Sequence, residues 1–358
     1  MSRRLLILTE GHTNPHTAKT ASCLIRYCRD EVVALLDSTQ RGKTTQELLG
    51  VGGDLPVVAS IAEAPGANTL LLGIAPAGGK IPLPWRKVIL EAISRGMGVT
   101  AGLHDFLTED PEFVEAARRS GVTLTDVRKN DEKDVARQQG LRGDCLRILT
   151  VGHDCSVGKM VTAVEITNGL KRAGHDAKFL ATGQTGIMVE GDGCPIDRVI
   201  ADFVSGAVEK MVKRNQHHEI LLIEGQGSLV HPSYSGVTLS LLHGAAPQAM
   251  ILCYEIGRDT VSGLEHLKIP PLKKMRELNE TMASIFWPCR VIGVSMISRL
   301  VDAQAAEAER TRVQRELGVP VCDVIRHGPD ALVNAILQFQ SQDGWRKLDI
   351  GVPESGGS

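Results

Sequence analysis

Short apolar runs alternate with amphipathic stretches along almost the whole chain of 358 residues. The clearest apolar runs are residues 4–9, 31–36, 69–73, 97–101, 146–151, 177–181, 220–223, 249–254 and 291–294, with shorter ones near Val122 and Val321. Helix-like patterns cover residues 18–28, 84–95, 111–120, 159–172, 198–214, 302–317 and 329–340. Continuous apolar strands that alternate with helices predict parallel sheets covered on both faces, and hence an α/β fold.

The chain is too long for one typical domain, and a charged stretch near its middle suggests where it divides. Residues 129–145 lack a sustained apolar stripe, which is typical of a linker. We therefore expect a Rossmann-like domain over residues 1–128 and a second parallel-sheet α/β domain over residues 146–342. Residues 343–358, which end in Glu-Ser-Gly-Gly-Ser, are expected to form a loosely held tail.

The composition favours a soluble protein with buried cores. Hydrophobic residues make up 42% of the chain and aromatic residues only 3%, and the net charge is −2, so nucleic acid is not expected as a partner. Residues 236–254 are the most membrane-like stretch, but His243, Pro247 and Gln248 predict a helix, a turn and a buried strand there. The eight cysteines contain no C-x-x-C pair, which favours reduced thiols in a cytoplasmic protein.

A glycine-bounded loop follows the apolar run 146–151. It extends from Gly152 to Gly158-Lys159 and leads at once into a helix-like segment. This arrangement binds phosphates, because backbone N–H groups turn inward, the helix N-terminus is partly positive and the lysine amine neutralises phosphate oxygens. The loop, with five residues between its glycines, resembles that of dethiobiotin-synthetase-like nucleotide-binding proteins, which implies a P-loop NTPase-like domain. The expected phosphate contacts are Gly152, His153, Asp154, Cys155, Ser156, Val157, Gly158, Lys159 and Met160.

The residue after the lysine departs from the common pattern. Such loops carry Ser or Thr at this point, whose hydroxyl holds magnesium, whereas this chain carries Met160. Thr162 falls on a different face of the helix and is a poor substitute. The loop therefore indicates phosphate or pyrophosphate binding more strongly than magnesium-dependent ATP chemistry, and no metal site is expected. A purely structural strand-to-helix turn is the alternative.

Three residues at the predicted strand ends carry reactive groups. Glu224 follows the apolar run 220–223 directly, so it could hold a metal or act as a general base, and a solvated strand-end carboxylate is the alternative. Asp154 lies inside the phosphate loop and is a second candidate base. The nearby helix N-terminus and Lys159 would favour a thiolate at Cys155, although a small packing residue is the simpler interpretation.

Further polar residues follow the same strands and are candidates for binding a substrate. Thr182, Gln184 and Thr185 offer hydroxyl and amide groups. His231 is another candidate base or substrate contact, although a lone loop histidine is more often structural. Arg258 could pair with a substrate carboxylate, and an ordinary ion pair is equally compatible with its position.

The first domain lacks the fingerprint of dinucleotide-binding proteins. The loop after its first strand reads Gly-His-Thr-Asn-Pro-His, without the G-x-G-x-x-G pattern. Asp37, after the second strand, could bind a ribose hydroxyl, but an aspartate at the end of a strand is more often a turn former. NAD binding in this half is therefore not favoured.

Five motifs together resemble one family over nearly the whole chain. They are Gly-Ile-Ala-Pro-x-Gly-Gly, Gly-His-Asp-Cys-Ser-Val-Gly-Lys-Met, Thr-Gly-Gln-Thr-Gly, Gly-Asp-Gly-x-x-x-Asp and Glu-Gly-Gln-Gly-Ser-Leu-x-His-Pro. The family was long catalogued as a domain of unknown function, with a Rossmann-like N-terminal and a P-loop-type C-terminal domain. Some members are D-glutamate N-acetyltransferases that use acetyl-CoA in D-amino-acid catabolism. His153 departs mildly from the family loop, where a small residue is expected.

The resemblance implies an acetyl-CoA-dependent N-acetyltransferase that acts on a small acidic amino acid. The phosphate loop would hold the pyrophosphate of CoA without hydrolysing it, Glu224 or Asp154 would deprotonate the substrate amine, and direct attack by the amine is preferred over a Cys155 acyl-enzyme. An ATP-dependent carboxylate-activating enzyme and a non-catalytic nucleotide-binding module are the rival hypotheses. We expect a homo-oligomer that uses small-molecule substrates.

Overall fold

The computed structural model describes residues 2–74, 79–342 and 345, which form two compact units. The first unit comprises the chain up to Lys129 together with Ile187–Gly191, and the second comprises Asn130–Gly186 and the chain from Asp192 onward. The predicted tail lies outside the described residues except for Trp345, as do residues 75–78 of the Gly-Ile-Ala-Pro motif.

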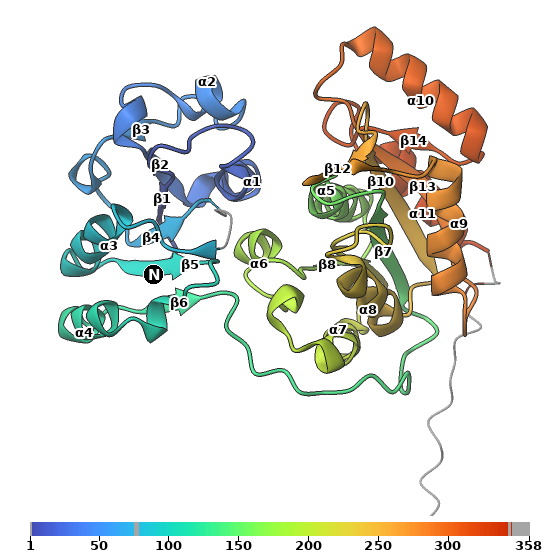
Figure 1. The fold of residues 1–358 in the computed structure, drawn as a ribbon, viewed down its shortest axis with the longest axis horizontal. Coiled ribbons are helices and arrows are strands. Elements are labelled where there is room, and N and C mark those ends of the chain that lie inside the picture. Colours follow the sequence, from blue (N-terminus) through green and yellow to red (C-terminus); the bar gives the residue numbers. More distant parts are fainter. Residues whose placement is uncertain (1, 75–78, 343–344, 346–358) are drawn as a thin grey trace, which may run out of the picture. The chain divides into compact units, whose positions relative to one another are not determined.

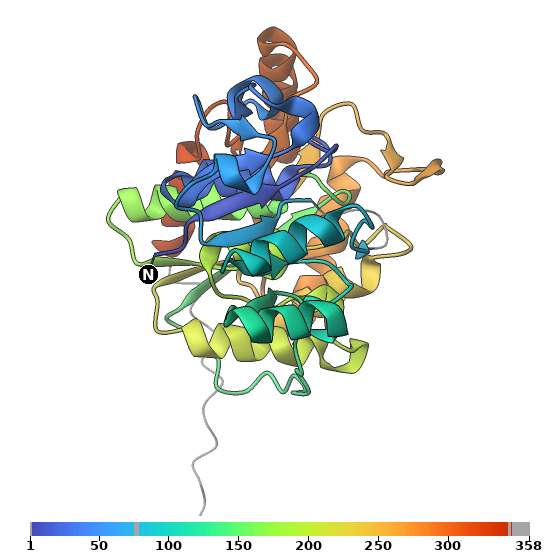
Figure 2. The same ribbon diagram turned by 90° about the vertical axis from the view of Figure 1, so that its left-hand side faces the viewer.

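The first unit is built on a six-stranded parallel sheet in the order β3-β2-β1-β4-β5-β6 (Figure 1). Its strands are β1 (Leu5–Leu8), β2 (Val32–Leu36), β3 (Val57–Val58), β4 (Thr69–Leu72), β5 (Gly98–Ala101) and β6 (Leu124–Asp126). Its helices are α1 (Lys19–Tyr27), α2 (Thr45–Leu49), α3 (Trp85–Ser94) and α4 (Pro111–Ser120). Helices α3 and α4 lie side by side (Figures 1 and 2). This strand order is that of Rossmann folds, which confirms the predicted Rossmann-like class.

Asp37 has a structural role in this unit. Its buried carboxylate accepts hydrogen bonds from the Thr13 hydroxyl and from the hydroxyl and N–H of Thr39. Although burial alone would raise the pKa of Asp37, these hydrogen bonds outweigh it and hold the pKa below its ordinary value. The residue therefore fixes the turn after β2, in agreement with the turn-forming interpretation.

A short piece of the chain far along the sequence completes the first unit. Ile187–Gly191 includes the second half of α6 (Gln184–Glu190), and Met188 is buried in the core of this unit. The Arg3 guanidinium donates to the Met188 carbonyl at 3.1 Å, and the Cys28 thiol donates to the Val189 carbonyl at 3.5 Å. From the sequence these residues were expected in the second domain, because local patterns carry no information about such long-range packing.

The second unit contains another six-stranded parallel sheet, in the order β14-β13-β10-β7-β9-β8. Its strands are β7 (Leu146–Gly152), β8 (Ala177–Leu180), β9 (Ile220–Ile223), β10 (Ala249–Glu255), β13 (Arg290–Ile297) and β14 (Val321–Cys322). Its helices, besides the start of α6, are α5 (Lys159–Arg172), α7 (Ala201–Asn215), α8 (Ser235–Ala245), α9 (Leu272–Ala283), α10 (Ala303–Leu317) and α11 (Asp330–Gln340). The predicted pair of parallel α/β sheets is confirmed.

Helices cover both faces of this sheet, which buries every residue of the central strands β7, β9 and β10. Helices α7, α8 and α9 lie on one face, and α5 and α11 lie on the other (Figure 1). Because all the strands are parallel, their carboxyl ends meet along a single edge. The loops that follow β7, β8, β9, β10 and β13 are therefore gathered at that edge.

Two features of the second unit were missed in the sequence analysis. Helix α9 was not predicted, and the structure shows that it buries only Met275 and Asn279. The antiparallel hairpin of β11 (Thr260–Val261) and β12 (Leu264–Lys268) is mostly polar and partly exposed, and so carries no apolar strand signal.

The charged stretch 130–145 contains no helix or strand, but it is held against α7 and the end of α8. The buried Glu209 carboxylate accepts hydrogen bonds from the N–H groups of Arg137 and Gln138 at 2.9 and 2.8 Å. A Cβ on Gly206 would lie 1.9 Å from the Asp134 carbonyl oxygen, so the glycine permits this close approach. The segment therefore packs against the second unit and belongs to it.

Gly225, directly after β9, permits a similarly close approach beside the P-loop. Its N–H donates to the Thr150 hydroxyl at 2.9 Å, and an added Cβ would lie 1.6 Å from the Thr150 carbonyl oxygen. We expect Gly225→Ala to lower the free energy of unfolding by at least about 3 kcal/mol, because buried backbone would have to move. Gly236→Ala, in open space near the start of α8, is the matched control and should cost nothing. Equal unfolding midpoints in urea for the two variants would contradict this packing.

Helices in residues 2–74 and 79–342 are all too short or too polar to cross a lipid bilayer. The eight cysteines are all free thiols, as their sequence spacing indicates, and five of them are buried.

Candidate functional site

The P-loop lies at the centre of the carboxyl edge of the second sheet, between β7 and α5. Ser156 and Gly158 adopt left-handed backbone conformations, with φ of 57° and 79°. Such positions curl a loop so that successive N–H groups can face one anion, and a non-glycine residue there stores strain that is common at functional sites. The predicted residues 152–159 therefore do form a curled loop that ends at a helix N-terminus.

Lys159 folds back into this loop. Its side chain is buried, and its ammonium group donates to the Asp154 carbonyl oxygen at 2.8 Å. A Cβ on Gly152 would come within 3.0 Å of the lysine Nζ, so the first glycine of the motif makes room for the amine. Burial lowers the pKa of Lys159. A phosphate entering the loop would supply the negative charge that this buried amine lacks.

Asp154 is locked in place by three hydrogen bonds. One carboxylate oxygen accepts from the Cys155 N–H at 2.7 Å, and the other accepts from Arg258 at 3.1 Å and from the Ser262 N–H at 2.9 Å. Both oxygens of this fully buried carboxylate are therefore engaged. Asp154 therefore connects the P-loop to the β11–β12 hairpin. Because both of its oxygens are engaged, it is a weaker candidate base than the sequence suggests.

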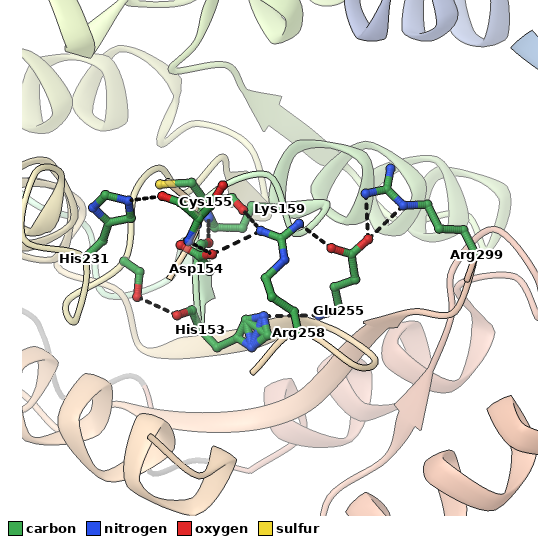
Figure 3. A network of polar contacts seen from close by, with 10 residues as sticks. His153, Asp154, Cys155, Lys159, His231, Glu255, Arg258 and Arg299 are labelled. Atoms are coloured by element: carbon green, nitrogen blue, oxygen red, sulfur yellow. Dashed lines mark hydrogen bonds and ion pairs between the residues drawn. The ribbon is translucent and has the colours of Figure 1, made fainter. Parts of the chain in front are cut away.

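Arg258 belongs to a row of alternating charges beside the P-loop. Its guanidinium donates to the Cys155 carbonyl at 2.7 Å and also to the carboxylate of Glu255. Figure 3 shows Glu255 between Arg258 and Arg299, and the Arg299 guanidinium lies 2.6 Å from the Glu255 carboxylate. The substrate-binding role predicted for Arg258 would require it to exchange one of these carboxylates for that of the substrate.

The two histidines near the loop are both engaged through their rings. Burial lowers the pKa of His153 to about 4, so the ring is neutral, and its Nε2 accepts the Glu255 N–H at 3.3 Å. His231 accepts the Ser233 N–H on Nδ1 at 3.2 Å, so Nε2 carries the proton and donates to the Ser262 carbonyl at 3.2 Å. His231 thus positions the hairpin in this geometry, and neither of its nitrogens is available as a base.

One group of potential metal ligands occurs among the described residues. Ligand atoms of Asp154, Cys155 and His231 lie within 4.8 Å of one another. A cation there would have to displace the hydrogen bonds that occupy both Asp154 oxygens and both His231 nitrogens. We therefore assign no metal to this group.

The start of α5 does not supply the hydroxyl that binds magnesium in other P-loops. Met160 offers no oxygen, and the Thr162 hydroxyl is buried and bonded to the Ser295 hydroxyl at 2.7 Å. The chemistry of this position therefore suits phosphate binding by N–H groups and Lys159 rather than a bound magnesium ion.

Glu224 is the most distinctive titratable group of the site. It lies directly after β9 and is 6% exposed, and its Oε2 accepts hydrogen bonds from the N–H groups of Thr182 and Gly183 at 2.8 and 3.1 Å. Its Oε1 accepts no hydrogen bond from the part of the chain that the structure describes. A Cβ on Gly186 would lie 2.5 Å from Oε2, so the Thr-Gly-Gln-Thr-Gly motif leaves room for this carboxylate.

Burial raises the pKa of Glu224 to about 7, although the two backbone N–H groups and the nearby charge of Lys159 oppose the shift. A carboxyl group with this pKa is half ionised near neutral pH. It can therefore take a proton from an ammonium group in one step and release it in another, as a general base must.

Three other predicted substrate contacts lie in the segment that begins at Thr182, whose N–H donates to this carboxylate. The Thr182 hydroxyl donates to the Glu224 carbonyl at 2.8 Å and accepts from the Gln226 amide at 3.3 Å. Gln184 is buried and Thr185 is half-buried in the first turn of α6, directly after the Thr182–Gly183 segment. The structure thus places Thr182 in contact with Glu224, and Gln184 and Thr185 follow it in the same segment of the chain.

Three members of the site were missed in the sequence analysis: Glu255, Ser262 and Arg299. Glu255 ends an apolar strand just as Glu224 follows one, and that signal could have found it. Ser262 and Arg299 carry no comparable signal, because their positions depend on the hairpin and on the pairing of β10 with β13.

Comparison with known proteins agrees with this architecture. Residues 134–333 match the model of a domain of unknown function, the DUF1611 P-loop domain, and residues 38–130 match the DUF1611 Rossmann-like domain. A crystal structure of a DUF1611 family protein from Anabaena variabilis superposes with a TM-score of 0.89 at 37% sequence identity, and the match covers 94% of this chain and 100% of that one.

Two curated relatives are similar over most of their length. A D-glutamate N-acetyltransferase of Tritonibacter scottomollicae is 41% identical over 277 residues, which cover 77% of this chain and 83% of the relative. A D-glutamate N-acetyltransferase of a Pseudoalteromonas species is 39% identical over 277 residues, with 76% and 83% coverage. These relatives support an N-acetyltransferase enzyme. From both of its domain matches and from these relatives, the chain is identified as a member of the DUF1611 family.

Proposed function

We propose that the chain is an acetyl-CoA-dependent N-acetyltransferase that acts on a small acidic amino acid, D-glutamate, in D-amino-acid catabolism. The observation that carries the proposal is a buried carboxyl group, Glu224, whose pKa is raised to about 7 beside a P-loop suited to phosphates without magnesium. The names of the relatives supply the acyl group and the amino acid.

The P-loop would hold the pyrophosphate of acetyl-CoA. N–H groups of the loop and of the first turn of α5, with the Lys159 amine, would supply hydrogen bonds and positive charge to it. Binding of this kind requires no hydrolysis, so the absence of a magnesium-binding hydroxyl at Met160 costs nothing.

Glu224 would start the reaction by taking one proton from the substrate ammonium group. The free amine then attacks the thioester carbonyl carbon, so that an N–C bond forms and a tetrahedral oxyanion develops. Collapse of this intermediate breaks the C–S bond, and the second proton lost by nitrogen passes to the CoA thiolate. The proton held by Glu224 returns to solvent, which leaves the N-acetyl amino acid, CoA and one proton.

The acidic substrate would need a cation, and two are at hand. Arg258 and Arg299 flank Glu255 at the same sheet edge, and their side chains are 18% and 38% exposed. Guanidinium groups bind carboxylates through paired hydrogen bonds. Arg258, which also touches the P-loop at Cys155, is our choice for the side-chain carboxylate of D-glutamate.

Release of the CoA thiol tests this function directly. We expect the purified chain to release CoA from acetyl-CoA when D-glutamate is added, with full activity in excess EDTA, since no step uses a metal. N-acetylglutamate should appear in equal amount by mass spectrometry. Turnover of Mg-ATP with a carboxylate substrate, and no reaction with acetyl-CoA, would instead establish the ATP-dependent alternative.

Cys155 should be dispensable for acyl transfer. Burial raises the pKa of this thiol despite the nearby Lys159 and Arg258, which reverses the thiolate expected from the loop sequence. We therefore expect Cys155→Ala to keep kcat within about threefold of the unmodified chain, because an amine that attacks directly needs no acyl-enzyme. Loss of activity by more than 100-fold, together with acetylated Cys155 after incubation with acetyl-CoA alone, would show the opposite mechanism.

A further inference from the structure

A pocket lies in the same unit as the P-loop but at the opposite edge of the sheet, where the strands begin. Its volume is about 740 Å³, which is within the usual range of small-molecule sites. It is lined chiefly by Gln248 before β10, by Phe286, Trp287 and Arg290 at the start of β13, and by Phe339 and Trp345 at the end of α11. The P-loop residues do not line it, so it is a separate site.

The lining is unusual for this chain because it concentrates aromatic side chains. The whole sequence has three tryptophans and six phenylalanines, and two of each line this one pocket. Phe286 is 66% exposed at its rim, whereas Phe339 is packed beneath the Arg290 guanidinium at 4.9 Å. Aromatic walls of this kind bind a flat or branched apolar body.

The charge of the pocket is one-sided. Among the residues that the structure describes, no aspartate or glutamate lines it, and Arg290 forms no ion pair with a carboxylate. Its guanidinium donates to the side-chain oxygen of Gln342 and lies over the Phe339 ring. A guanidinium that is partly covered by an aromatic ring and lacks an acid partner favours an anion.

A second cation, Arg147, lies next to the pocket and contacts one of its lining residues. Arg147 is fully buried at the start of β7, and its backbone N–H donates to the side chain of the lining residue Gln248 at 2.7 Å. Its guanidinium meets only backbone carbonyls, of Ala246, Arg142 and Cys145, and its Nη2 has no hydrogen-bond partner. A buried cation without a carboxylate is costly, and a bound anion nearby would offset that cost.

We propose that this pocket binds a small organic monoanion with an aromatic or branched apolar body, whose acid group meets Arg290. The apolar body would fill the space between Trp287, Phe339 and Trp345, and the positive field of Arg147 would add to the preference for an anion. The proposal uses no residue of the acetyl-transfer site and stands independently of the proposed function.

Calorimetric titration of the unmodified chain with 4-phenylbutyrate tests the pocket, with its uncharged amide, 4-phenylbutanamide, as the matched probe. We expect saturable binding of the acid and at least about tenfold weaker binding of the amide, since a charge-assisted hydrogen bond is lost. Arg290→Gln, a change at an exposed position, should abolish the difference between the two probes. Equal affinities for acid and amide in the unmodified chain would overturn the proposal.

Fluorescence locates the binding. In a Trp85→Phe variant both remaining tryptophans line the pocket, so the acid should change their emission with the same midpoint as in the calorimetry of the unmodified chain. Saturable binding that leaves this emission unchanged would place the probe elsewhere and contradict the proposal. Binding that appears only after residues 346–358 are removed, or only at protein concentrations too low for self-association, would assign the pocket to the tail or to a second copy and would equally overturn it.

Discussion

Glu224→Gln is expected to lower kcat about 10²- to 10⁴-fold, the usual contribution of a general base, while the KM for acetyl-CoA changes by less than about threefold. The glutamine oxygen can still accept the Thr182 and Gly183 N–H groups, so the loop should keep its shape. What the variant loses is the ability to take a proton from the substrate ammonium group. Steady-state kinetics with D-glutamate and acetyl-CoA measure both constants.

The pH profile of the unmodified enzyme gives the same prediction an independent test. Glu224 acts as a base only when ionised, and burial raises its pKa to about 7. The rate should therefore rise as the pH increases through about 7, and fall about tenfold per pH unit well below it. In Glu224→Gln the residual rate should no longer rise with pH in this range. Glu224→Asp is the control, because it keeps a carboxylate on a side chain one methylene shorter. Its rate should be lower but should still rise with pH through this range.

If the rate of Glu224→Gln still rose with pH in the same way, another group would be the base. Asp154 would then be the next candidate, although its oxygens are held by Arg258 and by two N–H groups. Circular dichroism at the assay temperature would establish that the variant is folded in either case.

Lys159→Ala should weaken acetyl-CoA binding about 10- to 100-fold, because one charge-assisted hydrogen bond to a phosphate is worth roughly 1.5–3 kcal/mol. The ammonium group is already inside the loop, 2.8 Å from the Asp154 carbonyl, so it needs only a small change of partner to reach an entering phosphate. Calorimetric titration with acetyl-CoA measures the loss. Titration with D-glutamate should be affected much less.

Lys171→Ala is the matched control for this variant. Lys171 lies in the last turn of the same helix and is exposed, so its removal changes the net charge by the same amount without touching the P-loop. We expect its affinity for acetyl-CoA to be unchanged. A similar loss in both variants would mean that acetyl-CoA responds to overall charge and not to the loop.

Much of the fold could be predicted from local patterns. The apolar runs at β1, β7 and β9 are fully buried strands, and their alternation with helices gave the two parallel sheets. Elements whose burial is slight, such as α9, or whose partners are distant, such as Ile187–Gly191, escaped because their stability comes from contacts that no short window contains.

The sequence identified many of the residues that form the site, but not their protonation or their hydrogen-bond partners. The glycine spacing identified the P-loop, and the strand-end position identified Glu224, since both signals are local. The protonation of Cys155 was not predictable. The helix N-terminus and Lys159, which lower the pKa of the thiol, are visible in the local sequence, whereas the burial that raises it depends on the whole fold. The engagement of Asp154 and His231 likewise depends on Ser262, which only the hairpin brings near.

A crystal structure with CoA bound tests the central claim most directly. The account predicts the pyrophosphate inside the loop 152–159, with Lys159 within hydrogen-bond distance of a phosphate oxygen and no metal ion beside it. A structure in which the coenzyme binds elsewhere on the chain while this loop holds no phosphate would contradict the account.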